Sequence, residues 1–316
     1  MIVYDIIQFY LECILFVNKS LLLVLVIFLS QSQAYSFSKI VFFGDSLSDS
    51  GNACPLGQEK NRAFCALYPG ERFTHKDSLV WAEHFVAEFG LDLRPSRLKG
   101  DNFAFGGATS GLGSLETPGV LTQIEGYLKR SRGHADPDAI YVIWVGGNDV
   151  KNQAIPLDLL NNIKIGVERL TKRGARNFIV PNLLPIHETP ITKWAVSAVA
   201  SVSKYFYDWH QKDSSLQHSD VTSALDNIFE KGVIFYNRRL DKMLHTLEKD
   251  GHTRICKPDM FAFFKAVSQN PKKYGLVSTE DLFYVDFFHP SAAAHKIIAV
   301  AIAKECSIEF SSLSSS

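Results

Sequence analysis

The chain has 316 residues, of which 46% are hydrophobic and 21% are charged, a composition typical of a globular protein with a substantial core. Its 33 basic residues balance its 33 acidic residues, and no basic stripe stands out. This balance argues against nucleic acid as a partner, and against binding to anionic membranes through charge alone.

The N-terminal segment has the pattern of an export signal. An uninterrupted apolar run over residues 21–29 follows Lys19 and precedes small and polar residues. Because the run is short for a membrane span, we predict a signal peptide over residues 1–34. The protein is then secreted or, in a bacterium, periplasmic. Residues 1–18 make a long leader, which leaves a later start or a membrane anchor as alternatives.

Beyond the leader, short apolar runs alternate with longer amphipathic stretches, as is typical of a parallel sheet covered by helices. We predict one α/β domain over residues 35–310 and a disordered tail over 311–316. The expected strands are residues 40–43, 139–145, 177–181 and 233–236. The expected helices are residues 157–173, 237–249 and 292–304, the last capped by Ser291.

Two aromatic-rich stretches have two interpretations each. The first hypothesis for residues 191–210 is a helix that buries an apolar stripe in the core, and the alternative is a roof over the functional site. Residues 260–264 likewise belong either to the core or to a ligand pocket. The stripe in the first stretch consists of Ala195, Val199, Val202, Phe206 and Trp209.

Cysteine usage agrees with export. Of the 5 cysteines, Cys13 would leave with the leader. The short separation of Cys54 and Cys65, in a loop that contains Gly and Pro, favours a local disulfide. Cys256 then pairs with Cys306. Free buried cysteines, as in a cytosolic protein, are the alternative.

Ser46 is the first candidate for chemistry. It lies in the motif Gly44-Asp45-Ser46-Leu47, directly after the expected strand 40–43. A serine on a tight turn at the carboxyl end of a buried strand is well placed as a nucleophile. Its own backbone N–H could also stabilise an oxyanion. Alone this motif is a weak indication, because Gly-Asp-Ser turns are common.

The segment 286–289 supplies the remaining groups of a nucleophilic triad. Its three-residue spacing lets one turn hold the Asp286 carboxylate against the His289 imidazole. A general base and the group that orients it require this arrangement. His295 is a rival base, but it lies within a helical pattern, which favours a structural role.

Two further motifs supply hydrogen-bond donors. Asn148 follows Gly146-Gly147, and its side-chain amide offers two N–H donors. The pair Gly106-Gly107 can bring a backbone N–H close to a substrate. Each motif alone is more often a turn or a helix cap. Together and in this order, the four motifs predict a serine ester hydrolase.

These motifs resemble the GDSL lipases of the SGNH hydrolase superfamily. The resemblance covers nearly the whole chain beyond the leader, and Val285 stands where the family usually has an aromatic residue. It implies a single-domain three-layer α/β/α sandwich with a central parallel sheet, of flavodoxin-like type. The absence of a Gly-x-Ser-x-Gly motif argues against the ordinary α/β-hydrolase fold. The matched blocks are Phe43–Asn52, Asn102–Ala108, Gly146–Asp149, Val180–Pro185 and Asp286–Pro290.

The resemblance also assigns roles to residues. It implies Ser46 as nucleophile, His289 as base and Asp286 as the group that orients the base. The oxyanion hole would consist of the Ser46 N–H, the Asn148 side chain and the N–H of Gly107, which is preferred over Gly106 for its place before Ala108. This chemistry needs no cofactor and no metal, and no metal-binding histidine pattern occurs in the sequence.

The long spacing between the third and last blocks resembles secreted bacterial lysophospholipases, phospholipases A and glycerophospholipid:cholesterol acyltransferases. It implies a lipid ester substrate, transient contact with a membrane surface and, as an option, acyl transfer to a sterol acceptor. A carbohydrate or short-chain aryl esterase with the same catalytic residues is the first alternative. A binding protein that keeps the fold without catalysis is the second.

Overall fold

The computed structural model describes residues 37–55, 63–68, 70–151, 156–211 and 217–306. By its internal contacts the chain divides into two compact units, Met1–Ser36 and Phe37–Ser316, and the described residues all belong to the second. The predicted leader over 1–34 and the predicted tail over 311–316 lie outside the described residues. Both therefore stay predictions.

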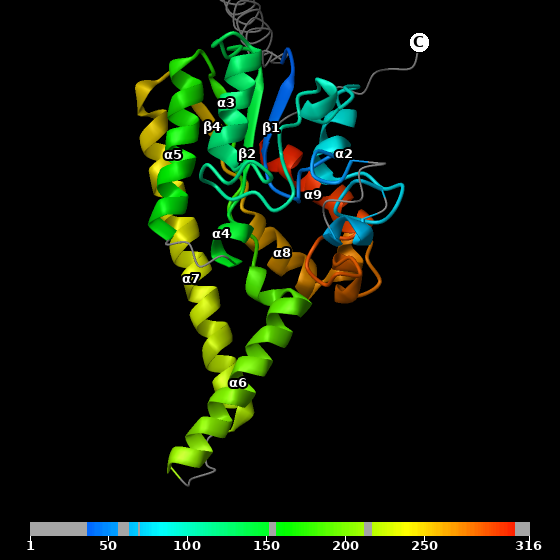
Figure 1. The fold of residues 1–316 in the computed structure, drawn as a ribbon, viewed down its shortest axis with the longest axis vertical. Coiled ribbons are helices and arrows are strands. Elements are labelled where there is room, and N and C mark those ends of the chain that lie inside the picture. The colour runs from blue at the N-terminus through cyan, green and yellow to red at the C-terminus, as the bar shows by residue number, and fades with distance from the viewer. Residues whose placement is uncertain (1–36, 56–62, 69, 152–155, 212–216, 307–316) are drawn as a thin grey trace, which may run out of the picture. The chain divides into compact units, whose positions relative to one another are not determined.

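A four-stranded parallel sheet forms the centre of the fold (Figure 1). Every residue of its first two strands is buried, as expected where helices cover both faces of a parallel sheet. The predicted parallel sheet is confirmed, and so are the first three of the four predicted strands. In spatial order the strands are β1 (Ile40–Gly44), β2 (Ile140–Trp144), β3 (Asn177–Ile179) and β4 (Arg254–Cys256).

Alternate strand residues enter two separate cores, which gives the three predicted layers. The helices are α2 (Trp81–Ala87), α3 (Val120–Arg130), α4 (Gly147–Lys151), α5 (Pro156–Lys172), α6 (Pro190–Gln211), α7 (His218–Leu247), α8 (Met260–Gln269) and α9 (Ala292–Glu305). Phe43 and Ile143 pack on the face covered by α3, α5 and α7, whereas Phe42 and Val142 pack on the face covered by α2, α8 and α9.

The strand predicted at residues 233–236 is wrong, because these residues lie inside α7. Val233 and Tyr236 are buried, whereas Phe235 between them is 53% exposed. Burial continues at Leu240 and Leu244, and spacings of three and four residues make a helical stripe. The helix predicted over 237–249 is the C-terminal part of α7. The fourth strand, β4, was not predicted.

Two other predicted helices are confirmed as α5 and α9. The Ser291 hydroxyl accepts a hydrogen bond from the Ala294 N–H, so Ser291 caps α9 as expected. In α8, Met260 and Phe264 are buried in the core with α9 and the sheet, which supports the core interpretation of residues 260–264.

Both predicted disulfides are present, Cys54–Cys65 and Cys256–Cys306. The second joins the end of β4 to the residue that follows α9, across 50 residues of sequence. It therefore ties the last helix to the edge strand of the sheet.

Replacing both Cys256 and Cys306 with serine is expected to lower the free energy of unfolding by about 2–4 kcal/mol, because the unfolded chain regains the entropy of a long open loop. Urea unfolding of this variant, beside the native protein, measures the change. An unchanged midpoint in urea would contradict a stabilising bridge.

α6 and α7 pack against each other as a hairpin, and α6 lies beyond the edge of the sheet where the strands end (Figure 1). The core-facing stripe predicted in residues 191–210 is wrong for its described members, because α6 buries Val196 and Ala200 instead. The predicted stripe also includes Phe206 and Trp209, whose side chains lie outside the part of the chain that the structure describes. Ala195 is exposed, and so are five larger hydrophobic side chains on α6: Ile191 (41%), Trp194 (70%), Val199 (53%), Val202 (56%) and Tyr205 (69%).

Within the described residues, no helix combines the length and hydropathy that crossing a bilayer requires.

Candidate active site

Ser46 lies two residues beyond the end of β1. The strand can pair with β2 up to Gly44 because this residue has no side chain: a Cβ there would lie 2.3 Å from the Trp144 carbonyl oxygen. The chain then turns, and the Asp45 carbonyl accepts hydrogen bonds from the N–H groups of Ser48 and Asp49. This single turn presents Ser46 outside any helix, with 5% of the residue exposed.

A tight turn also forms the Asp286–His289 segment. One carboxylate oxygen of Asp286 accepts the backbone N–H groups of Phe288 and His289, both at 3.0 Å. Phe287 has a φ of 60°, a conformation that a bulky side chain rarely adopts and that is concentrated at functional sites. The turn leaves the second oxygen of Asp286 free to face the imidazole.

The structure brings the three predicted triad residues into one hydrogen-bonded chain. Nε2 of His289 lies 2.7 Å from the Ser46 hydroxyl oxygen, and Nδ1 lies 2.5 Å from the second oxygen of Asp286. Burial would raise the pKa of Asp286. The hydrogen bond and charge of His289, with the hydroxyl of Tyr68, instead hold that pKa well below its usual range. Asp286 is therefore an anion, and its second oxygen is hydrogen-bonded to the imidazole.

The rival base, His295, occupies a different environment. Its ring is fully buried in α9, and its Nδ1 accepts the backbone N–H of Trp81 at 3.0 Å. Burial lowers the pKa of His295 to about 3, so it stays neutral. Its neighbours give it a structural role.

The predicted oxyanion donors have unequal geometry. Asn148, in α4, donates one amide proton to the Ala108 carbonyl at 2.9 Å and keeps a second for a substrate. The N–H of Gly106 donates to Asp49 at 2.8 Å, so it is already used. Among the described residues, the N–H of Gly107 has no recorded acceptor, and neither has that of Ser46. This pattern favours Gly107 over Gly106.

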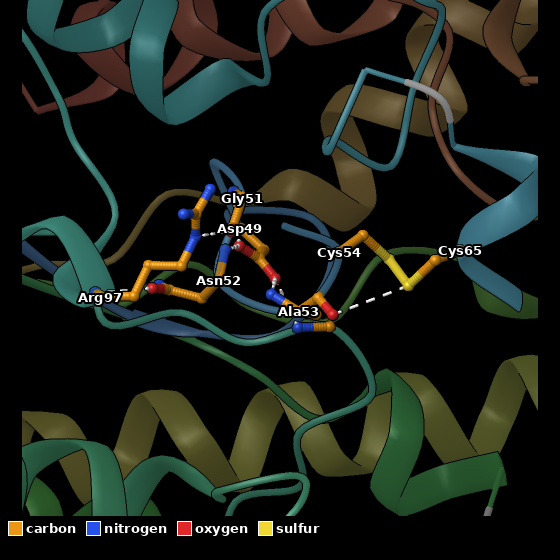
Figure 2. The surroundings of a disulfide bond; sticks show 8 residues. Asp49, Gly51, Asn52, Ala53, Cys54, Cys65 and Arg97 are labelled. Carbon is orange, nitrogen blue, oxygen red and sulfur yellow. Dashed lines mark hydrogen bonds between the residues drawn. A yellow bond between two sulfur atoms is a disulfide. The ribbon is translucent and has the colours of Figure 1, made fainter. Parts of the chain in front are cut away.

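Buried polar side chains lock the motifs together. The Asp49 carboxylate accepts the N–H groups of Gly51, Asn52 and Ala53, toward which Figure 2 shows it turned, as well as that of Gly106. Burial raises the pKa of Asp49 to about 6, although these N–H groups counteract it. The first motif is thereby fixed to the second.

The third motif is fixed in the same way. Asp149 accepts both the N–H and the hydroxyl of Ser110, the latter at 2.6 Å. In the first motif, burial raises the pKa of Asp45 to about 7, with the N–H of Leu47 acting in the opposite direction. Asp45 directs its carboxylate at its own turn and, among the recorded contacts of the described residues, makes no hydrogen bond to the triad.

A small cavity of about 50 Å³ opens beside Ser46 and Asn148. Its wall is mainly apolar, which suits the acyl part of an ester better than a charged group. Thr189 of this wall directly precedes α6, and Ile186 lies in the turn just before it, so the cavity is next to the start of α6. The other apolar side chains of the wall are Leu47, Trp144, Val145, Leu183, Leu184 and Phe288.

Two residues of the site were missed by the sequence analysis. The Gln123 amide holds Gly44 by accepting its N–H and donating to its carbonyl, at 2.9 and 2.8 Å. The Tyr68 hydroxyl donates to Asp286 at 2.5 Å. Neither Gln123 nor Tyr68 lies in a motif. The sequence offers one indication for Tyr68, its place three residues after a cysteine predicted to form a disulfide, and none for Gln123. Among the described residues, no cluster of three or more His, Cys, Asp or Glu could hold a metal ion.

Replacing Asn148 with alanine is expected to lower kcat by about 100- to 1,000-fold with little change in KM, because the lost amide would stabilise the oxyanion formed during the reaction. Initial rates on a soluble ester measure both constants. Asn162→Ala is the matched control: this amide donates to the Ser110 hydroxyl, away from the cavity. Equal losses in the two variants would contradict an oxyanion role for Asn148.

Comparison with known proteins gives a consistent picture. The sequence profile of the GDSL-like lipase/acylhydrolase family matches residues 40–302. "Lipase 1" of Photorhabdus luminescens is 25% identical over 85% of this chain and 50% of its own length. The chain thus spans half the length of that relative. An acetylesterase of Thermothelomyces thermophilus is 25% identical over 84% of this chain and 86% of its own.

Among solved structures, an acetylxylan esterase from Geobacillus stearothermophilus aligns with a TM-score of 0.46 and 15% identity. The alignment covers 86% of this chain and 95% of the esterase.

Proposed function

Because the chain belongs to the GDSL-like lipase/acylhydrolase family, we propose that it is a serine hydrolase of carboxylic esters with Ser46 as its nucleophile. The observation that carries the proposal is the hydrogen-bonded chain from the Ser46 hydroxyl through both nitrogens of His289 to the Asp286 carboxylate. A buried serine, a base and an ionised orienting group meet here as acyl transfer requires.

The reaction follows from these positions. His289 Nε2 takes the hydroxyl proton of Ser46 as the oxygen attacks the ester carbonyl, and the N–H groups of Ser46, Gly107 and Asn148 stabilise the oxyanion. The ester oxygen leaves as an alcohol with the proton from His289. Water, deprotonated by the same imidazole, then attacks the acyl-serine. The acid is released as the Ser46 oxygen takes that proton back from His289. Any other alcohol in place of water would give acyl transfer.

We propose a lipid ester, a lysophospholipid or phospholipid, as the substrate. The apolar wall of the cavity supports this assignment. Its 50 Å³ is far below the roughly 300–1,000 Å³ of a typical ligand pocket. A long acyl chain would therefore leave the cavity past Ile186 and continue along α6. There Trp194 and Val199 expose apolar surface that could meet a lipid assembly.

A short-chain ester, such as an acetylated carbohydrate or an aryl ester, is the second candidate. The same small volume favours it, because about 50 Å³ holds few non-hydrogen atoms. The acetylesterase among the relatives, matched over most of its length, also supports this candidate.

A panel of substrates separates the two candidates: lysophosphatidylcholine, diacyl phosphatidylcholine vesicles with and without a sterol, acetylated xylo-oligosaccharides and p-nitrophenyl butyrate. We expect fatty acid release from lysophosphatidylcholine, and any sterol ester formed reports acyl transfer. Turnover of the acetylated or aryl esters alone would contradict the lipid assignment. No turnover of any of these esters would contradict the proposal that the protein is an ester hydrolase.

Substitution of the exposed face of α6 tests the lipid contact. The double variant Trp194→Ser/Val199→Ser is expected to lower the rate on phospholipid vesicles about tenfold, since it removes apolar area that would enter the lipid surface. Its rate on p-nitrophenyl butyrate should not change. Leu98→Ser, at a 56% exposed residue outside the hairpin, is the control. A vesicle rate equal to that of the native protein would contradict the contact.

We also propose export from the cytoplasm, with residues 1–34 as the signal and the hydrolase domain over 35–310. The two disulfides support export, because such bridges persist in oxidising compartments. Mass spectrometry of the protein recovered outside the cells that express it would locate the cleavage site. Recovery with residues 1–34 still attached would contradict the signal.

A further inference from the structure

Tyr68 lies against the triad although it is distant in sequence. Its hydroxyl donates to the second oxygen of Asp286 at 2.5 Å, and its oxygen lies 3.1 Å from Nδ1 of His289. The two residues it meets are 218 and 221 positions further along the chain. Tyr68 is 6% exposed, so water cannot readily replace its hydroxyl.

One arrangement of protons satisfies all three groups. Asp286 is ionised and can only accept, so Tyr68 must donate its hydroxyl proton to the carboxylate. Nδ1 of His289 must then carry a proton, which the carboxylate and the Tyr68 oxygen both accept. Nε2 is left with a lone pair directed at the Ser46 hydroxyl at 2.7 Å. The triangle of Tyr68, Asp286 and His289 thus fixes the tautomer that a base needs.

Rings and a disulfide hold Tyr68 in place. Its N–H donates to the carbonyl of Cys65, which is bridged to Cys54 in the loop after the Ser46 motif. Its ring packs on Phe73 with centroids 4.5 Å apart and meets the His289 ring edge to face at 5.6 Å. The Tyr68 hydroxyl is therefore positioned by a segment that directly follows a disulfide-bonded cysteine.

We propose that Tyr68 is a positioning residue of the triad, which orients Asp286 and sets how strongly its carboxylate stabilises the protonated imidazole. This inference rests on the proposed ester hydrolysis. The hydrogen bond from the Tyr68 hydroxyl partly neutralises the negative charge of the Asp286 carboxylate. Without it, the carboxylate would stabilise protonated His289 more strongly and would be held less firmly in place.

Tyr68→Phe tests the proposal, with Tyr284→Phe as the matched control. The Tyr284 hydroxyl donates to the carbonyl of Leu67, so this hydroxyl anchors the same loop without a hydrogen bond to the triad. The backbone N–H of Tyr284, which donates to the His289 carbonyl at 2.7 Å, is kept in the variant. For Tyr68→Phe we expect kcat on a soluble ester to fall about tenfold with KM unchanged. The acid limb of the pH profile of kcat/KM should move to higher pH by about half a unit. Tyr284→Phe should leave both quantities as in the native enzyme.

Equal losses in the two variants, or an acid limb that does not move in Tyr68→Phe, would overturn the proposal, because a merely structural tyrosine gives those results. The low-field proton resonance of Nδ1–H in His289 gives a readout that does not need turnover. It should change in Tyr68→Phe and stay constant in Tyr284→Phe. If the native protein cleaves no ester, the proposed function fails, whereas this resonance still decides whether Tyr68 acts on the Asp286–His289 pair.

Discussion

Replacing Ser46 with alanine should lower kcat for ester hydrolysis by about 10⁴- to 10⁶-fold, the loss expected when the nucleophile of a triad is removed. No bond to the acyl group can then form, and residual turnover depends on water. Among the described contacts, the Ser46 hydroxyl bonds to His289 alone, so the variant should fold normally. Rates on p-nitrophenyl butyrate and thermal melting measure the two effects.

Ser48→Ala is the matched control for this variant. Ser48 lies two residues further in the same turn, where its hydroxyl accepts the indole N–H of Trp81 at 3.0 Å. Losing this bond should lower the melting temperature by a few degrees, whereas kcat should stay within a few-fold of the native value. A Ser46→Ala enzyme that kept activity within tenfold of the native enzyme would remove Ser46 as the nucleophile.

His289→Ala should cost kcat as much as Ser46→Ala, and the double variant should lose no more than either single one. The nucleophile and base act as a unit, so removing one makes the other useless. Steady-state rates of the three variants at one pH measure this non-additivity. Losses that multiplied in the double variant would show that the two residues act independently.

His295→Asn separates the base from its rival. The substitution removes a buried ring that accepts the N–H of Trp81, so we expect lower stability but a nearly native kcat per folded molecule. Loss of kcat in His295→Asn, with activity kept in His289→Ala, would reverse the assignment of the base.

The motifs could be located from the sequence because each combines a local backbone requirement with one reactive group. Gly44 permits close strand pairing before Ser46, and Asp286 can fold the turn that carries His289. The structure holds Asp286 against His289 as their three-residue spacing predicted, and it brings Ser46 to His289 as the combination of motifs predicted. Residue spacing gives no such signal for Tyr68, because its contact with Asp286 depends on the path of a loop.

The errors in secondary structure have physical causes. Residues 233–236 are all apolar or aromatic, so their pattern suits a short strand as well as one turn of a buried helix. The continuation of the stripe through Leu240 and Leu244 decides for the helix. β4 has three residues, Arg254–Cys256, of which only Ile255 is buried, so no apolar run marks this strand in the sequence.

The stripe of α6 was misjudged for a different reason. A helical period identifies an apolar face but not what covers it. α6 lies beyond the sheet edge, where it buries Val196 and Ala200 and leaves Val199 and Val202 exposed. The exposed face is the structural basis for the proposed contact with lipid.

Covalent labelling with a fluorophosphonate, followed by peptide mass spectrometry, tests most directly the claim that Ser46 is a nucleophile activated by His289. We predict one adduct, on the peptide that contains Ser46, formed in the native protein and essentially absent in His289→Ala. An adduct on a different residue, or ester turnover with no adduct on Ser46, would contradict the account.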